Sequence, residues 1–228
     1  MSLKLSVIMP VYNEEDTLEE IVQRVREVGL ASEIVIVDDG SKDRTREILS
    51  SIQSLPEVRV ILHEKNQGKG AAVVTGIRAA VGDVMIVQDA DLEYDPQDYH
   101  LLLPPLEAGE CDVVYGSRFS ESSQDALMMN YLANRFLTIS TNLLYGSKLT
   151  DMETCYKVFR REVVEGMTIH ARRFEFEPEF TAKILKQKVR VKEVPISFNP
   201  RGYSDGKKIT AWDGVIALWT LIKYRFVD

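Results

Sequence analysis

The sequence VMIVQDADL, from Val84 to Leu92, decides how the rest of the chain is interpreted. Its four leading apolar residues are typical of a buried strand, and two carboxylates follow closely. Because side chains alternate along an extended chain, Asp89 and Asp91 leave the sheet on the same side. Two neighbouring carboxylates form half of a site for Mg²⁺ or Mn²⁺, which completes its shell with water and phosphate oxygens. An Asp-rich turn after a strand has the same pattern.

Composition limits the possible classes of protein. A chain of 228 residues with 45% hydrophobic and 28% charged side chains is typical of one large or two small soluble domains. The net charge of −7 argues against a nucleic-acid partner, which normally requires a basic face. No apolar run approaches the length of about 18 residues that a membrane span needs. We therefore predict a soluble, cytoplasmic protein.

The cysteines and histidines predict no metal site of their own. Cys111 and Cys155 lie far apart in a chain without a cleavable signal segment, which indicates reduced thiols. The three histidines show no ligand spacing.

Strands and helices alternate before residue 84. Apolar, largely β-branched runs predict strands over residues 5–11, 33–37 and 58–62. Between and after them, helices are predicted to begin near residues 13, 41 and 69, with Ser41 as an N-cap and Gly29 ending the first helix. This alternation is typical of a parallel sheet covered on both faces.

Polar clusters follow three of these strands, and such sheets bind ligands at the carboxyl ends of their strands. The clusters are Tyr12-Asn13-Glu14, Asp38-Asp39-Gly40-Ser41 and Asp89-Ala90-Asp91, with the turn Asn66 to Gly70 nearby. Turn and cap residues would also explain each cluster taken singly. Neither a P-loop nor a dinucleotide fingerprint is present, which disfavours a Rossmann dehydrogenase. Lys69, at a helix start, is placed to offer its charge to a phosphate.

These four motifs, in this order, resemble those of family-two glycosyltransferases of the GT-A fold. The chain resembles dolichyl-phosphate mannose synthases and bacterial polyprenyl-phosphate glycosyltransferases, and the resemblance covers nearly the whole chain and is strongest over residues 5–118. It implies an α/β fold with a single Rossmann-like, mixed and mainly parallel sheet flanked by helices. It also implies one domain over residues 1–228, with a nucleotide-sugar half (1–118) and an acceptor half (119–228).

The resemblance assigns roles in the first half of the chain. Pro10, Tyr12 and Glu14 are expected to line the nucleoside pocket, with Asp38 holding the base or ribose. Lys69 and the Asp89-Ala90-Asp91 segment are expected to bind the donor diphosphate. Asp89 and Asp91 would ligate Mg²⁺ or Mn²⁺. Glu93, where relatives often carry Gln, is a candidate third ligand.

In the second half, Arg118 follows a strand over 112–117 and resembles an arginine that faces an acceptor phosphate; a surface salt bridge is the alternative. A guanidinium suits the task because its planar fork donates two hydrogen bonds. Arg135 is a second candidate for that phosphate. Asp151 is a candidate general base or acceptor-binding carboxylate, although an ionised phosphate acceptor needs no base.

The loop over residues 201–208 is basic and contains glycines, as expected of a lid. By resemblance, Arg201 and Lys207 or Lys208 would neutralise the leaving diphosphate. The catalytic candidates are Asp91, Asp151, Arg118 and Arg201, and Glu175 and Glu177 are second-choice carboxylates at a helix start. Amphipathic helices are predicted over 125–146 and 209–227, which either pack on the domain or contact a membrane surface or a membrane partner.

The resemblance predicts an inverting, metal-dependent glycosyltransferase. It would move a hexose, mannose or glucose, from a GDP- or UDP-sugar to a polyprenyl or dolichyl phosphate, with possible peripheral contact at the inner membrane face. One alternative is the same fold acting on a saccharide hydroxyl, for which Asp151 would be a true base. Another is a nucleotide-sugar-binding subunit of a membrane complex that does not catalyse transfer.

Overall fold

The strands form a single mixed sheet in the part of the chain that the structure describes. The structure, a computed structural model, describes residues 3–119, 128–200 and 211–227. The sheet order is β3-β2-β1-β4-β6-β5-β7. The strands are β1 (Leu5–Val11), β2 (Ala31–Asp38), β3 (Val58–Leu62), β4 (Val84–Val87), β5 (Val113–Ser117), β6 (Lys157–Arg160) and β7 (Val191–Pro195). The predicted mixed, mainly parallel sheet is confirmed.

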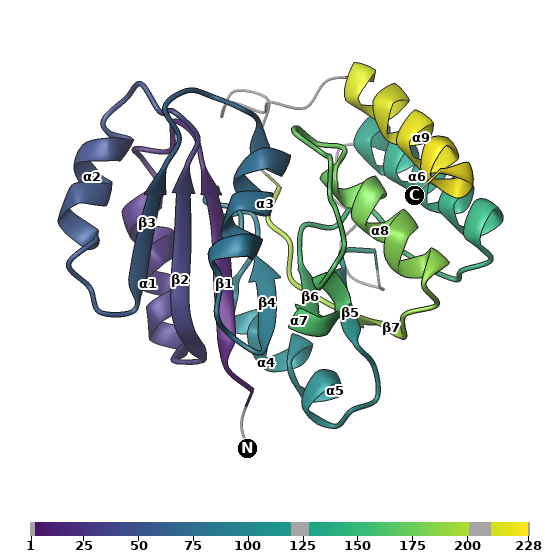
Figure 1. Cartoon of the computed structure of the whole chain (residues 1–228), viewed down its shortest axis with the longest axis horizontal. Coiled ribbons are helices and arrows are strands. Elements are labelled where there is room, and N and C mark those ends of the chain that lie inside the picture. Colours follow the sequence, from purple (N-terminus) through teal and green to yellow (C-terminus); the bar gives the residue numbers. More distant parts are fainter. Residues whose placement is uncertain (1–2, 120–127, 201–210, 228) are drawn as a thin grey trace.

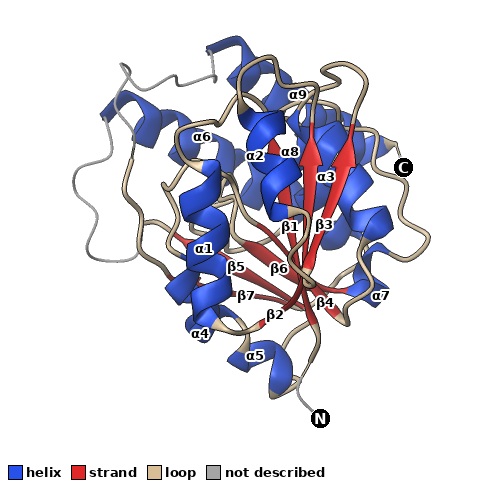
Figure 2. Ribbon diagram, turned by 90° about the vertical axis from the view of Figure 1, so that its left-hand side faces the viewer, coloured by secondary structure: helices blue, strands red, loops and turns tan. Residues whose placement is uncertain are grey.

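Helices cover the sheet on both sides. They are α1 (Leu18–Val28), α2 (Thr45–Ile52), α3 (Lys69–Ala79), α4 (Tyr99–Leu102), α5 (Pro104–Glu107), α6 (Met128–Tyr145), α7 (Arg161–Val164), α8 (Phe176–Lys186) and α9 (Ala211–Phe226), with a 3₁₀ turn η1 (Pro96–Asp98). Figure 1 shows α3 in front of the strands, and Figure 2 shows α1 and α4 on the opposite side from α3. Helices α6, α8 and α9 pack together beyond β5 and β6 (Figure 1).

The sequence patterns account for the elements of the first half. Strands β1 and β4 are almost entirely buried, and β2 is buried over residues 34–38, as expected for strands covered on both faces. Helix α1 buries one stripe against the sheet, formed by Leu18, Ile21, Val22 and Val25. It ends at Gly29, whose φ of 71° is the left-handed conformation that glycine adopts without strain.

The strand directions bring the polar clusters to one edge. Strands β1 to β4 are mutually parallel, so the segments after β1, β2 and β4 all lie at the carboxyl edge, the upper edge in Figure 1. Strand β6 is antiparallel to both β4 and β5, and β5 pairs in parallel with β7. The amino end of β6 therefore lies at this same edge, between the carboxyl ends of β4 and β5.

Three features differ from the sequence predictions. Helix α1 begins at Leu18 rather than near residue 13, because the chain turns at Asn13, whose φ is 52°. Ser41 does not cap α2, which begins at Thr45; its hydroxyl instead accepts a hydrogen bond from the Asn13 amide at 2.9 Å. Ser41 thus joins the ends of β1 and β2. The sequence analysis also assigned no strand to residues 157–160, because a four-residue strand is too short to show a period.

Candidate active site

The segment after β4 is fixed by a buried glutamine. Gln88 is fully buried, and its Oε1 accepts hydrogen bonds from the hydroxyls of Tyr99 and Tyr156, each at 2.6 Å. Its Nε2 donates to the Asp89 carbonyl at 3.0 Å. Leu92 has a φ of 61°, an uncommon conformation for a residue with a side chain. The buried hydrogen bonds of Gln88 therefore fix the start of the segment that presents Asp89 and Asp91.

Lys69 lies against the first of these carboxylates. Its Nζ is 2.8 Å from Asp89 Oδ1 and 3.6 Å from Glu177 Oε1, so it joins the starts of α3 and α8 to the end of β4. Burial disfavours the charged ammonium, but the two carboxylates raise the pKa of Lys69 well above its ordinary value. Lys69 thus remains a cation beside Asp89, as expected for a group that contacts a phosphate.

The turn that carries Lys69 is anchored by Asp39 and His63. Asp39 accepts hydrogen bonds from the backbone amides of Gln67 (2.9 Å) and Gly68 (2.7 Å). His63 Nδ1 lies 2.7 Å from Asp39 Oδ1, and its Nε2 lies 3.0 Å from the Thr75 hydroxyl. Both Asp39 and His63 are buried. No local sequence pattern indicates this network, because only the fold brings His63, from the end of β3, beside Asp39.

We expect His63→Ala to lower the free energy of unfolding by about 1–3 kcal/mol, because it leaves buried polar atoms of Asp39 and Thr75 with fewer partners. His63→Gln, which can still donate and accept, should lose less. Urea unfolding measures both. His100→Ala, at an exposed histidine, is the control and should change stability by no more than about 0.5 kcal/mol. Equal losses for His63→Ala and His63→Gln would contradict the hydrogen-bonding role.

The ends of β1 and β2 hold the predicted nucleoside contacts. Pro10, Tyr12 and Glu14 are partly exposed at the end of β1, and their contact with a nucleoside stays a prediction. Asp38 is fully buried, and its carboxylate accepts from Arg46 Nε at 2.7 Å and from the Ser41 amide at 3.2 Å. Asp38 therefore also holds the turn, and its contact with a base or ribose stays a prediction.

Arg118 and Asp151 form a buried, two-pronged ion pair. Arg118 Nε donates to Asp151 Oδ2 at 2.7 Å and Nη2 donates to Oδ1 at 2.8 Å, while the Arg118 amide also donates to Oδ2 at 3.1 Å. The Asp151 side chain is fully buried and that of Arg118 is 11% exposed. Burial opposes the charged guanidinium, but Asp151 raises the pKa of Arg118 above its ordinary value. The arrangement orients a cation, and a role of Asp151 as a general base or acceptor contact stays a prediction.

The loop that carries Asp151 is folded around a buried lysine. Lys157 Nζ donates to the carbonyls of Met152 (3.0 Å) and Thr154. Glu193 of β7 accepts from the amides of Thr150 and Asp151. Sequence reasoning missed Lys157, since a lysine is seldom expected in a fully buried position. The loop is thereby tied to the strands on either side of it.

The carboxylates after β4 suit a hard divalent cation that takes its remaining ligands from a bound phosphate and water. Asp89 and Asp91 are partly exposed and supply only oxygen. Among the described residues, no three His, Cys, Asp or Glu side chains are gathered as a metal-binding group. Glu93 is therefore not brought together with the pair, and its role as third ligand stays a prediction. Mg²⁺ and Mn²⁺ suit such a site, because they accept one or two carboxylates and take their other ligands from phosphate and water.

The remaining predicted residues fall outside the described part of the chain, lie on α6, or are buried cysteines. Arg201, Lys207 and Lys208 fall outside the described residues, so their roles stay predictions. Arg135 is on α6, partly exposed, and the described residues give it no ion pair. Cys111 and Cys155 are buried free thiols, as predicted, and burial raises the pKa of Cys155. This suits a packed thiol rather than a nucleophile.

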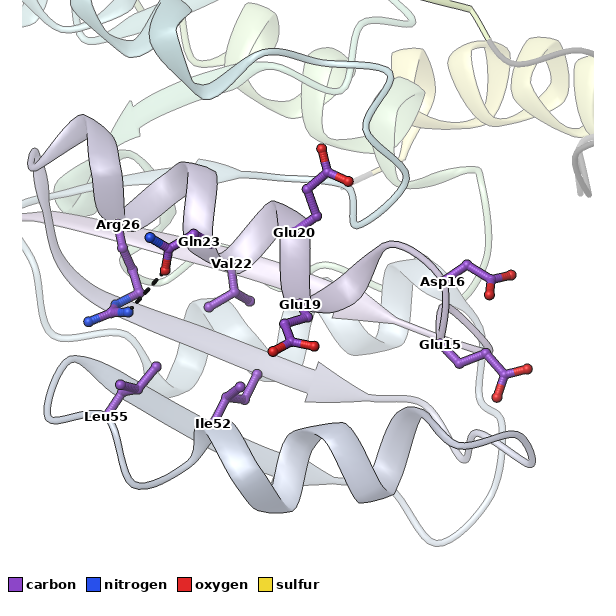
Figure 3. A pocket seen from close by; sticks show the side chains of 9 residues that line it. All are labelled: Glu15, Asp16, Glu19, Glu20, Val22, Gln23, Arg26, Ile52 and Leu55. Atoms are coloured by element: carbon purple, nitrogen blue, oxygen red, sulfur yellow. Dashed lines mark hydrogen bonds between the residues drawn. The ribbon is translucent and has the colours of Figure 1, made fainter.

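A separate groove lies between α1 and α2 (Figure 3). It measures about 620 Å³. It is lined by Glu15, Asp16, Glu19, Glu20, Val22, Gln23, Arg26, Ile52 and Leu55. None of the predicted site residues lines it, so we do not assign it to the active site.

Comparison with known proteins agrees with this geometry. The chain is 34% identical to a dolichol-phosphate mannosyltransferase of Pyrococcus furiosus, covering 98% of this chain and 65% of that protein. It is 35% identical to an undecaprenyl-phosphate 4-deoxy-4-formamido-L-arabinose transferase of Pectobacterium carotovorum, covering 76% of this chain and 54% of that protein. The chain thus spans less than two thirds of the length of these relatives.

The fold is shared with a solved enzyme. Glucosyl-3-phosphoglycerate synthase from Mycobacterium tuberculosis, crystallised with Mn²⁺, UDP and phosphoglyceric acid, superposes with a TM-score of 0.77 at 19% identity. The match covers 99% of this chain and 80% of that one. At the sequence level, the family described as "Glycosyl transferase family 2" matches residues 6–168. The predicted resemblance is confirmed: this chain belongs to glycosyl transferase family 2.

Proposed function

We propose that this chain transfers a hexose from a GDP- or UDP-sugar to the phosphate of a polyprenyl or dolichyl lipid, with inversion at the anomeric carbon. One observation carries the proposal. A buried guanidinium, held by Asp151, lies at the same sheet edge as the Asp89–Asp91 pair. The edge thus offers a carboxylate pair after β4 that would bind a metal on a donor diphosphate and, after β5 on the far side of β6, a fixed cation for a second phosphate.

The donor diphosphate is assigned to the end of β4. Asp89 and Asp91 would hold Mg²⁺ or Mn²⁺, and Lys69 would add a further positive charge from the start of α3. The presence of Mn²⁺ with UDP in glucosyl-3-phosphoglycerate synthase supports this assignment. When bound, the ion neutralises charge that develops on the leaving nucleotide. The predicted roles of Arg201 and of Lys207 or Lys208 would serve the same leaving group.

The acceptor phosphate is assigned to Arg118. Two of its nitrogens are fixed by Asp151, and its guanidinium carbon lies 5.2 Å from the Phe198 ring centre, so the plane of the group is set before a ligand arrives. A phosphate oxygen is already ionised near neutral pH and attacks the anomeric carbon directly. Asp151 then acts by positioning Arg118. Arg135 is the second candidate contact.

A lipid acceptor agrees with the outer faces of α6 and α9. Each helix exposes large apolar side chains at helical spacing: Leu132, Phe136, Ile139 and Leu143 on α6, and Trp212, Val215, Trp219, Ile222 and Phe226 on α9. The two helices pack side by side (Figure 1). Among the described residues, no helix is both long and apolar enough to span a bilayer. These apolar stripes suit an interfacial contact, which would bring the site to a membrane-embedded acceptor.

Trp219→Glu is expected to weaken binding to phospholipid vesicles by about tenfold or more, because a 64%-exposed indole would no longer enter the interface. Vesicle co-sedimentation measures this. Val81→Glu is the control, since Val81 is 73% exposed but precedes β4, at the opposite edge of the sheet. Equal vesicle binding by both variants would contradict the contact.

A donor and acceptor panel tests the proposal. UDP- and GDP-sugars are supplied with Mn²⁺ or Mg²⁺, with and without polyprenyl phosphate, and nucleotide release is measured. Release that requires the lipid phosphate supports the proposal and identifies the donor. Tight nucleotide binding without turnover on any acceptor would support a non-catalytic subunit instead.

A further inference from the structure

The loop before β6 connects the two halves of the candidate site. Because β6 lies between β4 and β5 and runs antiparallel to both, its preceding residues lie between the ends of those strands. Asp151 contacts Arg118 after β5, on the acceptor side. Cys155 Sγ lies 3.9 Å from Lys69 Nζ, on the donor side. Glu153 lies between Asp151 and Cys155 along this loop.

One oxygen of the Glu153 carboxyl is buried and unsatisfied within the part of the chain that the structure describes. Its Oε1 is buried and has no hydrogen-bond partner among the described residues. The charged groups around it are Glu177 on α8, Lys157 on β6, Arg118 after β5, and Asp151 on its own loop. These neighbours have other contacts, since Arg118 pairs with Asp151, Lys157 donates to carbonyls, and Glu177 lies near Lys69. Native proteins seldom leave a buried carboxyl oxygen unsatisfied without a reason.

The surroundings define the ligand that this oxygen would accept. Glu177 and Asp151 oppose an anion at this point, while Lys157 and Arg118 oppose a cation, so the surrounding charges offset one another. A neutral hydroxyl group fits both conditions. The sugar is the part of the donor that must lie between the diphosphate and the acceptor.

We propose that Glu153 binds a hydroxyl group of the transferred sugar and thereby selects which sugar is used. This inference rests on the proposed function for its substrate class. Burial and the nearby Glu177 carboxylate raise the pKa of Glu153 to about 8. At neutral pH the group is then largely a carboxylic acid, which both donates to and accepts from a hydroxyl.

Equilibrium binding tests this role without requiring transfer. The variant is Glu153→Leu, which keeps the side-chain bulk and removes the hydrogen-bonding atoms. Calorimetry with Mn²⁺ compares UDP, GDP, UDP-glucose and GDP-mannose, followed by monodeoxy analogues of the sugar that binds. We expect affinity for the nucleotide sugar to fall about tenfold and affinity for the free nucleotide to stay within about twofold. For one deoxy analogue, wild type and variant should bind equally, because the partner hydroxyl is already absent.

The stability of Glu153→Leu against unfolding distinguishes a sugar-binding role of Glu153 from a structural role. A residue kept for binding should be dispensable for folding, so Glu153→Leu is expected to match or exceed the wild-type unfolding midpoint. Glu193→Gln, which perturbs the same loop, is the control and should weaken every nucleotide sugar equally. The inference is overturned if Glu153→Leu affects all deoxy analogues alike or leaves nucleotide-sugar affinity unchanged. Should Glu153→Leu not fold, Glu153→Gln must retain the affinity and the hydroxyl dependence, or the inference fails.

A failure of lipid transfer leaves this test intact. If wild type binds nucleotide sugars but passes none to a lipid phosphate, the proposed acceptor is wrong, while the Glu153 result still stands on the binding data. If transfer occurs and Glu153→Leu shows no hydroxyl dependence, only the role of Glu153 is wrong.

Discussion

Asp91→Asn is expected to lower metal-dependent turnover of the nucleotide sugar by about 10³-fold, because the leaving diphosphate would lose much of the charge neutralisation that a bound cation supplies. The change removes one anionic ligand but keeps the size of the side chain. The strand end should remain folded, since its position depends on Gln88 and on the backbone at Leu92. The measurement is nucleotide release at saturating donor and acceptor, over a range of Mn²⁺ concentrations.

Asp95→Asn is the matched control. Asp95 lies four residues further along the same segment, and its side chain caps η1 by accepting from the Gln97 amide at 3.0 Å. Asparagine can also cap, so turnover should stay within about twofold of wild type. Direct titration of Mn²⁺ in the presence of UDP or GDP should show weaker binding for Asp91→Asn alone. Unchanged Mn²⁺ affinity and turnover in Asp91→Asn would contradict the metal assignment.

Arg118→Ala is expected to lower the free energy of unfolding by about 3–5 kcal/mol, because it leaves the fully buried Asp151 carboxylate without its counter-ion. The same change should abolish saturation by the lipid phosphate, since the proposed cation is gone. Urea unfolding and acceptor kinetics measure the two effects. The double variant Arg118→Ala/Asp151→Ala should regain part of the stability without regaining acceptor binding.

The chain contains an exposed pair of similar geometry as a control. Arg190 donates to Asp112 from Nε at 2.9 Å and from Nη2 at 2.7 Å, but its side chain is 56% exposed. Removing Arg190 should cost no more than about 1 kcal/mol. A loss for Arg118→Ala as small as that for Arg190→Ala would contradict the importance of burial in the Arg118–Asp151 pair.

The Arg118–Asp151 pair also makes it possible to test whether Asp151 acts as a general base. If Asp151 only positions Arg118, the pH dependence of transfer to a lipid phosphate should keep its shape in Asp151→Asn, at a lower rate. A limb at low pH that disappears in Asp151→Asn would identify a general base and favour the saccharide-hydroxyl alternative.

The sequence was sufficient to predict the sheet edge and the side chains that reach it. Apolar runs that alternate with predicted helices indicated parallel strands. Parallel strands bring Asp38, Lys69 and Asp89 to the carboxyl edge of the sheet, whatever their separation along the chain. The predicted end of the first helix at Gly29 is confirmed. These features are local, or follow from strand direction alone.

The remaining contacts depend on which distant residues the fold brings together. No local pattern indicates that His63 lies beside Asp39 or that Lys69 lies between Asp89 and Glu177. The antiparallel insertion of β6 has no sequence signature, yet it places Glu153 between the donor and acceptor sides. Asp151 was predicted as a base or an acceptor contact, whereas its partner in the structure is Arg118.

The central claim is that the sugar passes to a lipid phosphate at this sheet edge. The most direct test supplies a nucleotide sugar labelled in the sugar, Mn²⁺ and polyprenyl phosphate, and follows the label. We predict that label enters an organic-extractable sugar–phosphate lipid, that chelation of Mn²⁺ stops this transfer, and that Arg118→Ala prevents it. Label that stays water-soluble, or that moves only to a soluble hydroxyl acceptor when one is added, would contradict the claim.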